Sequence, residues 1–354
     1  MMTELGRGWT GGNRFRPARE VEIRYGHDLL RNESADWPRY VVVTTPTAWK
    51  TAQPYLSKQP AETGIVHMLD WDHLEETSNT LPDDVELVVG MGGGTALDAS
   101  KYVALRKDLP LRLVPTVVST GAIIHGVFAN WKGHSTVDEG KDWPYCDFEH
   151  VLVDYDLVLA APWYLNTAGI GDVLCGYSGI TEWRYQADRG AATPVDENLV
   201  EPVLEYYRYL AQEFPKSLDS SGALTAESVG FIMRSVHERD DRQLTSPEAS
   251  GAGHMLTQVL EEVLQTGLIH GEVAALGGVA ACWATGDYQE LIHQLDSCKV
   301  RYRPSDMGLE RDQLRDVFEH ASVFYPERNM DTILAREPIV GEKFDEFWDF
   351  VHGV

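Results

Sequence analysis

The chain has 354 residues, enough for two domains with separate cores, and 43% of its residues are hydrophobic. Its formal net charge of −25 argues against nucleic acid or an anionic membrane surface as a partner, because both are negatively charged. The four cysteines form no Cys-x-x-Cys pair and are expected to be reduced. Without an apolar leader segment or a run long enough to span a membrane, the sequence predicts a soluble, cytoplasmic protein.

Short apolar segments alternate with helical segments over the first 160 residues. Strands are predicted, in chain order, at residues 21–25, 40–44, 64–69, 87–89, 111–115 and 151–154. A hairpin or lid is expected between the last two strands, at 131–150. Strands separated by helices at this spacing favour a parallel sheet with helices on both faces. Residues 1–160 are therefore expected to form an α/β, dinucleotide-binding domain.

From residue 161 onward the apolar residues recur at helical spacing. Helices are predicted at 166–189, 198–212, 225–237, 250–265, 271–284 and 312–321. The second domain, residues 161–354, is therefore expected to be all-helical.

Residues 87–104 contain a predicted strand, a glycine turn and a helix start. Glycines remove side chains where the backbone must turn: Gly90, Gly92, Gly93 and Gly94. Thr95 is expected to cap the helix, with Asp98 at the capping-box position. The N–H groups of such a helix start suit a pyrophosphate, although any tight strand-to-helix turn would use similar glycines.

The glycine loop, followed by Asp98 and Lys101, resembles a Gly-Gly-Gly-x-x-x-Asp-x-x-Lys loop. That loop is typical of the family containing iron-dependent alcohol dehydrogenases, glycerol dehydrogenase and glycerol-1-phosphate dehydrogenase. Residues 115–120 are similar to the family's Pro-Thr-x-x-Ser-Thr loop, which lies along the nicotinamide. The resemblance implies a dehydroquinate synthase-like fold and bound NAD or NADP. It assigns the cofactor to these residues: Thr45, Gly92, Gly93, Gly94, Thr95, Asp98, Thr116 and Ser119.

Segments 168–184, 250–254 and 269–273 match the family in order and place Asp172, His254 and His270 at its metal-ligand positions. One carboxylate and two imidazoles leave coordination positions open for a substrate oxygen, as catalytic metal sites do. Either histidine alone would more often be structural. The resemblance implies one divalent ion (zinc, iron, nickel or manganese) in the cleft between the two halves. Catalytic roles are also expected for Lys101, in the glycine loop motif, and for His125.

The expected activity is that of an NAD(P)-dependent, metal-containing alcohol dehydrogenase, a homo-oligomer acting on a small molecule. Residues 182–184 and 325–334 resemble the glycerol-1-phosphate dehydrogenase branch. Gly121 replaces the aspartate of polyol-oxidising members, and His125 stands where a serine is common. These departures predict a phosphorylated or otherwise anionic substrate. A further departure is Gly253, at a position where that branch has glutamate.

Three alternatives remain open on the sequence. One is a sugar-phosphate cyclase resembling 3-dehydroquinate synthase, whose glycine loop would continue differently. Another is a cyclitol or polyol dehydrogenase, for whose bulkier neutral substrate Gly121 makes room. The third is a non-catalytic descendant that binds metal or nucleotide.

The choice between NAD and NADP depends on an acidic residue that binds the ribose 2′-hydroxyl and repels a 2′-phosphate. Residues 45–47, directly after the strand at 40–44, contain no acid. NADP(H) is therefore expected to be accepted at least as well as NAD(H), unless Asp70 or Asp72 supplies the missing acid.

Overall fold

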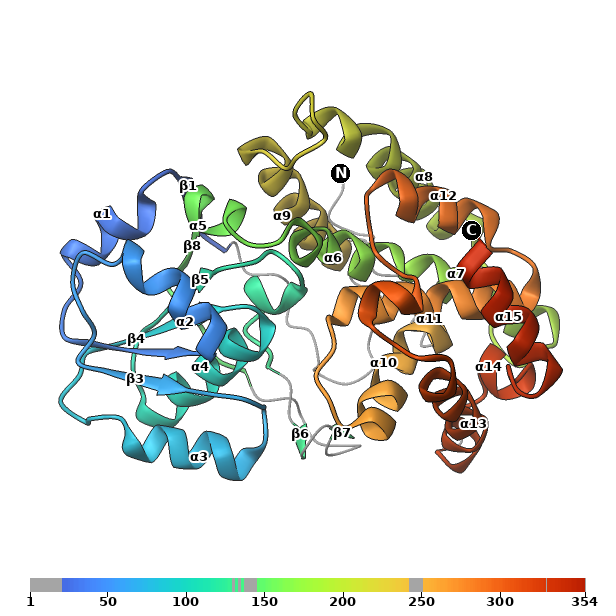
Figure 1. Cartoon of the computed structure of the whole chain (residues 1–354), viewed down its shortest axis with the longest axis horizontal. Coiled ribbons are helices and arrows are strands. Elements are labelled where there is room, and N and C mark those ends of the chain that lie inside the picture. The colour runs from blue at the N-terminus through green and yellow to red at the C-terminus, as the bar shows by residue number, and fades with distance from the viewer. Residues whose placement is uncertain are drawn as a thin grey trace. The chain divides into compact units, whose positions relative to one another are not determined.

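The computed structural model describes residues 21–128, 131–132, 135–136, 145–241, 251–328 and 330–353. They form two compact units (Figure 1). The first, here called the α/β unit, contains the described residues up to Asn166 together with 224–233. The second, the helical unit, contains the described residues of 167–223 and 234–353. The chain passes to the helical unit within α6 (Trp163–Leu174), returns to the α/β unit between Ala223 and Leu224, and passes to the helical unit again within α9 (Ala226–Asp241).

The α/β unit is built on a six-stranded parallel sheet. Its strands lie in the order β1-β8-β5-β4-β2-β3. Their bounds are β1 (Ile23–Gly26), β8 (His150–Asp154), β5 (Leu111–Pro115), β4 (Leu87–Gly92), β2 (Tyr40–Thr44) and β3 (Glu62–Ile65). Every residue of β2, β4 and β8 is buried, as their runs of valine and leucine predict for strands covered on both faces.

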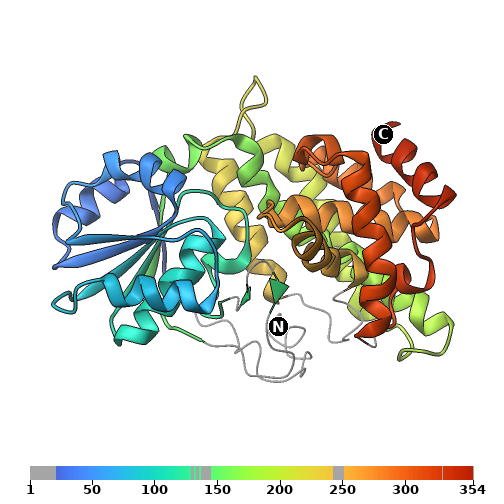
Figure 2. The ribbon, with the colours of Figure 1, turned by 60° about the horizontal axis from the view of Figure 1, so that its bottom comes forward.

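Helices cover both faces of this sheet (Figure 2). On one face lie α1 (Leu29–Ala35) and α2 (Pro46–Ala52). On the other lie α3 (Trp71–Thr80) and α4 (Gly94–Lys107). A short helix, α5 (Tyr155–Leu159), follows β8. This arrangement places the carboxyl ends of all six strands along one edge, where ligands bind in open α/β sheets.

The glycine turn differs from its prediction in two ways. Strand β4 continues through Gly90 to Gly92, so the chain turns later than expected. The predicted cap at Thr95 is wrong, because Gly93 is the N-cap and α4 already begins at Gly94. Gly92 has a φ of 153°, which a residue with a side chain rarely adopts, and this allows the chain to enter the helix directly. The strand predicted at 64–69 also begins earlier, at Glu62.

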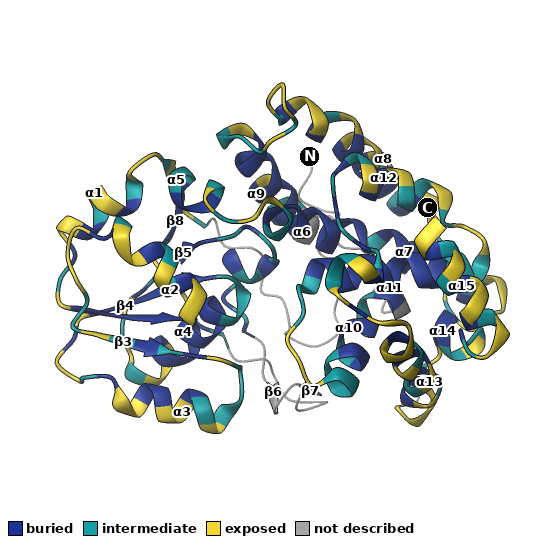
Figure 3. Cartoon of the chain, viewed as in Figure 1, coloured by how far each residue is buried: buried dark blue, intermediate teal, exposed yellow. Residues whose placement is uncertain are grey.

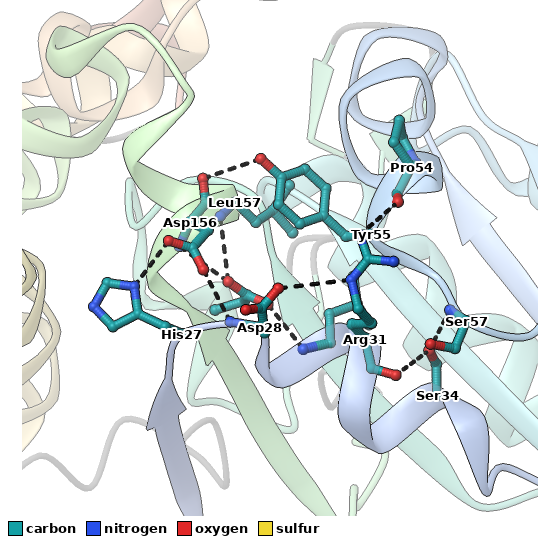
Figure 4. Close-up of polar contacts among 11 residues, drawn as sticks. His27, Asp28, Arg31, Ser34, Pro54, Tyr55, Ser57, Asp156 and Leu157 are labelled. Carbon is teal, nitrogen blue, oxygen red and sulfur yellow. Dashed lines mark hydrogen bonds and ion pairs between the residues drawn. The ribbon is translucent and has the colours of Figure 1, made fainter.

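A polar network joins the carboxyl ends of β1 and β8 (Figure 4). The buried Asp154 carboxylate accepts hydrogen bonds from the N–H groups of Leu30 (2.8 Å) and Asp156 (2.9 Å). The Asp156 carboxylate accepts one from the N–H of Asp28 (2.9 Å) and lies 2.8 Å from His27 Nδ1. Because it contacts the starts of both α1 and α5, this network fixes two connections at the edge of the sheet.

The helical unit contains the ends of α6 and α9 and eight further α-helices within the described residues. They are α7 (Gly176–Asp188), α8 (Glu197–Glu213), α10 (Gly251–Leu264), α11 (His270–Thr285), α12 (Gln289–Ser297), α13 (Arg311–Glu327), α14 (Ile333–Arg336) and α15 (Glu342–Gly353). Helix α11 is apolar almost all round, and residues 271–282 are all buried (Figure 3). It therefore forms the centre of this unit. The single helix predicted at 166–189 is interrupted at Cys175, between α6 and α7.

All four cysteines lie in the described part of the chain, where each is buried and free of disulfides, as predicted. None of the helices in the described ranges combines the length and the apolar composition needed to cross a membrane. Of the predicted hairpin or lid, the structure describes the antiparallel pair β6 (Trp131–Lys132) and β7 (Ser135–Thr136). Residues 133–134 and 137–144 of that segment, and Ser250 of the predicted 250–254 motif, lie outside the described residues.

Candidate metal and cofactor sites

Three helices of the helical unit bring one carboxylate and two imidazoles together. Asp172 lies on α6, His254 on α10, and His270 is the first residue of α11. His270 Nε2 lies 3.4 Å from Asp172 Oδ1, and His254 Nδ1 lies 4.0 Å from the same oxygen. The candidate ligand atoms of the three residues all lie within 4.8 Å of one another.

Glycines next to two of these residues allow α6 and α11 to touch along their backbones. A Cβ atom at Gly271, beside His270, would lie only 1.8 Å from the Ala168 carbonyl oxygen. A Cβ at Gly171, beside Asp172, would lie 2.6 Å from the Gly271 carbonyl oxygen. Since real Cβ contacts are never this short, the close approach of Asp172 and His270 depends on both glycines.

His254, the third candidate ligand, also lies beside a glycine that allows close contact between helices. Gly253 precedes His254, and a Cβ there would lie 2.6 Å from Ser178 Oγ and 2.7 Å from the Gly278 Cα. Helix α10 thus passes against α7 and α11 at a point that admits only glycine. A glutamate, which the glycerol-1-phosphate dehydrogenase branch has at this position, would not fit here. The glycine at this position therefore has a role in helix packing.

The cluster suits a divalent cation. The Asp172 side chain is only 3% exposed, and the side chains of His254 and His270 are 28% and 37% exposed, so an ion would reach the carboxylate from the histidine side. Two ligand atoms on one tetrahedral ion, each about 2.1 Å from it, are about 3.4 Å apart, close to the spacing between Asp172 and His270. A buried carboxylate also requires nearby positive charge. The residues present therefore fit a metal ion.

Two further acids of the helical unit are held partly neutral. Burial raises the pKa of Glu261 to about 7, and the charge of His270 opposes the rise. Burial also raises the pKa of Glu272 to about 7, opposed by Arg301, whose Nε lies 3.1 Å from Glu272 Oε1. Sequence inspection did not single out either residue, because a lone glutamate in a helix looks like a surface residue.

In the α/β unit, the candidate cofactor residues lie at the carboxyl ends of neighbouring strands. Thr45 follows β2, the three glycines follow or end β4, and Thr116 follows β5. The turns are linked directly, since Thr44 Oγ1 donates to the Met91 carbonyl (2.6 Å) and the Thr116 N–H donates to the Gly92 carbonyl (3.0 Å). No described side chain caps α4. Its first N–H groups are therefore available to an anion such as a pyrophosphate.

Lys101 is placed differently from the other predicted site residues. Its side chain is 0% exposed, and its Nζ donates to Asp98 Oδ1 (2.8 Å) and to the carbonyls of Ala122 (2.7 Å) and Val127 (3.2 Å). An ammonium group has three protons, so each has an acceptor here. Asp98, predicted to complete a capping box, is instead the partner of Lys101. Together they attach the loop after β5 to helix α4.

That loop contains Ser119, Gly121 and His125, all predicted to face ligand or substrate. The His125 ring lies against Gly121, because a Cβ built there would be 3.1 Å from His125 Cδ2. Ser119 and His125 are both partly exposed. The buried Asn166, which the sequence analysis missed, accepts a hydrogen bond from the Val118 N–H (2.9 Å) and donates one to the Val158 carbonyl (3.1 Å). It holds the loop at Val118, whereas Lys101 holds it at Ala122 and Val127.

The two segments that resemble the glycerol-1-phosphate dehydrogenase branch contact each other inside the helical unit. The buried Glu182 carboxylate accepts hydrogen bonds from the Ile333 N–H (2.7 Å) and from Gln186 Nε2 (3.1 Å). Gln186 also donates to the Asp331 carbonyl (2.7 Å). The residues that resemble the branch therefore have a structural role, which is to attach α14 to α7. Their resemblance is accordingly weaker evidence for a phosphorylated substrate.

Comparison with known proteins agrees with this architecture. Residues 19–162 match the family model of the iron-containing alcohol dehydrogenases. A glycerol-1-phosphate dehydrogenase [NAD(P)+] from Thermoplasma volcanium is 22% identical over 326 residues, which cover 87% of this chain and 90% of that protein. The enzyme of the same name from Aeropyrum pernix is 24% identical over 286 residues, covering 76% and 74%.

Among solved structures, a glycerol dehydrogenase from Schizosaccharomyces pombe superposes with a TM-score of 0.60 at 17% identity. The match covers 87% of this chain and 84% of that one. The predicted fold class, a parallel-sheet α/β domain with a helical second half, is confirmed. The chain is thus similar in sequence to the iron-containing alcohol dehydrogenases and the glycerol-1-phosphate dehydrogenases and similar in fold to glycerol dehydrogenase, the resemblance that its motifs indicated.

Proposed function

We propose that this chain is a metal-dependent, NAD(P)-linked dehydrogenase that interconverts a small phosphorylated or otherwise anionic hydroxy compound with its ketone or aldehyde. The observation on which this rests is the cluster of Asp172, His254 and His270, held by three glycine contacts between helices. The reaction class, an NAD(P)-linked alcohol dehydrogenase with a divalent metal, is confirmed by the family and the names of its relatives. The ligand roles and the substrate are our own proposal.

In this function the residues of each unit have distinct tasks. When bound, the divalent ion would polarise the substrate oxygen, and the nicotinamide would accept or give the hydride. Asp172, His254 and His270 would hold the ion. The glycine turn and the first N–H groups of α4 would hold the pyrophosphate, because that end of a helix carries partial positive charge. Oxidation of the alcohol transfers one hydride to the nicotinamide and releases one proton, and reduction is the reverse.

The anionic substrate is supported by the loop after β5. Where polyol-oxidising relatives have an aspartate, this chain has Gly121 with the His125 ring packed against it. An acceptor with negative charge is thereby replaced by an uncharged position beside a ring that can donate a hydrogen bond. A phosphate or carboxylate on the substrate is favoured by this exchange, and a neutral polyol loses a hydroxyl acceptor.

The test compares a matched pair of ketones. Dihydroxyacetone phosphate and dihydroxyacetone differ only in the phosphate, so oxidation of NADPH with each measures the preference for an anion. We expect purified protein to contain a divalent metal and to reduce the phosphorylated ketone faster. Efficient turnover of dihydroxyacetone, with its phosphate ignored, would instead favour a neutral polyol as substrate.

The metal assignment is tested by His270→Ala. This variant is expected to lose bound metal and to lose at least about 100-fold in kcat/KM, since Lewis-acid stabilisation of the reacting oxygen contributes several kcal/mol. The control is His293→Ala, which removes an exposed histidine of α12 in the same unit and is expected to change neither quantity. Full metal content together with full activity in His270→Ala would show the ligand assignment to be wrong.

A further inference from the structure

Cys175 lies at the break between α6 and α7, three residues after Asp172, and is buried. Its Sγ donates a hydrogen bond to the Asp172 carbonyl oxygen at 3.0 Å. The same sulfur lies 3.2 Å from His254 Nδ1. One thiol therefore contacts the backbone of one candidate metal ligand and the ring of another.

The protons in this arrangement can be assigned. A thiol has one proton, and here it is given to the Asp172 carbonyl. The contact between Sγ and Nδ1 must then use a proton on the imidazole, with sulfur as the acceptor. A neutral imidazole that is protonated at Nδ1 has its lone pair on Nε2, and this is the atom that can bind a cation.

We propose that Cys175 is a positioning residue that selects the Nδ1-protonated tautomer of His254 and orients its ring so that Nε2 binds the metal. This inference rests on the proposed metal-binding role of Asp172, His254 and His270. Ligand histidines commonly donate their second N–H to a carboxylate, a carbonyl or water, and losing that partner lowers metal affinity 10–100-fold. Because sulfur is a weak acceptor, we expect an effect near the lower end, about tenfold.

The experiment measures Zn²⁺ affinity of metal-stripped protein by competition with a chromophoric chelator. Cys175→Ala is expected to weaken binding about tenfold, whereas Cys175→Ser, whose hydroxyl can also donate and accept, should stay close to the parent. The matched control is Cys282→Ala, which removes a buried thiol from α11, twelve residues beyond His270. It is expected to leave Zn²⁺ affinity unchanged.

Two results would overturn the proposal. Equal Zn²⁺ affinity of Cys175→Ala and the parent would exclude a positioning role and leave the metal site itself intact. Equal losses in Cys175→Ser and Cys175→Ala would overturn it as well, because a role carried by hydrogen bonds should survive in the serine variant. If Co²⁺-loaded parent then showed a sulfur-to-cobalt charge-transfer band, Cys175 would be a direct ligand.

A second measurement does not need the metal at all. In metal-free parent protein, the imidazole ¹⁵N shifts of His254 should report a protonated Nδ1, and Cys175→Ala should show a mixture of tautomers. A parent protonated at Nε2 would contradict the inference. If the parent binds no divalent metal while these shifts follow expectation, the proposed function fails and the hydrogen-bond assignment stands.

Discussion

The two units position their candidate functional residues by different physical means. In the α/β unit, Thr45, the glycine turn and Thr116 each lie at or just after the end of a strand, and the register of the sheet brings these ends together. In the helical unit, Asp172, His254 and His270 come from three helices and meet because glycines allow backbone contact. The first site is a product of strand pairing within one sheet. The second exists only after distant helices have packed.

The two sites should therefore differ in how well their glycines tolerate replacement by alanine. Cβ atoms at Gly93 and Gly94 would meet methyl groups of Val117 and Thr120 at 3.2 and 3.1 Å, which small side-chain movements can relieve. Cβ atoms at Gly253 and Gly271 would meet backbone atoms at 2.7 and 1.8 Å. Only movement of whole helices would relieve those contacts, so Gly253 and Gly271 should tolerate alanine less well than Gly93 and Gly94 do.

Lys101→Met is expected to have the largest effect on stability, because it leaves Asp98 buried without its cation. Breaking a buried ion pair by removing one partner costs about 3–5 kcal/mol, measurable as a loss in the free energy of unfolding in urea. The control Lys107→Met, on the same helix as Lys101, removes an ion pair with the exposed Asp83 and a hydrogen bond to the Leu81 carbonyl, and should cost less, about 1–2 kcal/mol. Metal content should be unchanged, since Lys101 lies in the α/β unit; a parallel loss of metal would contradict this separation of the two sites.

Gly271→Ala is expected to separate α6 from α11. Overpacking of this kind costs about 1–3 kcal/mol of unfolding free energy, and here it should also weaken Zn²⁺ binding, because Asp172 and His270 move apart. On the same helix, Gly278→Ala is the matched control. A Cβ there would make ordinary contacts of 3.5 Å or more, so improved helix propensity, up to about 1 kcal/mol, should leave that variant neutral or stabilised. If Gly93→Ala in the α/β unit cost more than Gly271→Ala, the predicted order of fragility would be reversed.

Thr45→Asp should change cofactor preference without disturbing the fold. An acid after β2 would bind the ribose 2′-hydroxyl and repel a 2′-phosphate, so the ratio of kcat/KM for NADH to that for NADPH should rise roughly tenfold. Thr45→Asn is the control, since it has the shape of aspartate without the charge. The parent is expected to use NADPH at least as well as NADH. Asp70, the alternative acid, already accepts hydrogen bonds from the N–H groups of Asp72 and His73 at the start of α3. A parent with a strong preference for NADH would refute the prediction.

The smallest effect is expected at the edge of the sheet, from His27→Gln (Figure 4). The hydrogen bond to Asp156 raises the pKa of His27 above its ordinary value of 6.5. Stability from the pair is therefore fully present below pH 6.5 and is lost as pH rises through the raised pKa. The unfolding free energies of parent and variant should differ slightly below pH 6.5 and converge once the pH exceeds the raised pKa of His27. A difference that grew with pH would contradict this assignment.

The sequence alone determined the regular elements and the type of site. Strands β2 and β5 begin and end where their apolar, β-branched runs do, because such runs favour buried strands whatever surrounds them. The order of the glycine loop, Asp172, His254 and His270 indicated the family before any geometry was known. Local preferences failed at Thr95, where the length of β4 moved the helix start to Gly94.

Only the tertiary structure decided what several of these residues do. Lys101 appeared in the sequence as a candidate for catalysis, but the loop carbonyls that accept its protons come from 21 and 26 residues farther along the chain. In the sequence, Gly253 is notable only because the related branch has glutamate there, whereas in the structure it packs against Gly278. Cys175 has no role that the sequence indicates, but in the structure its sulfur lies beside His254 Nδ1. Backbone preference depends on near neighbours in sequence, whereas burial, clash and hydrogen-bond partnership depend on which distant segments pack together.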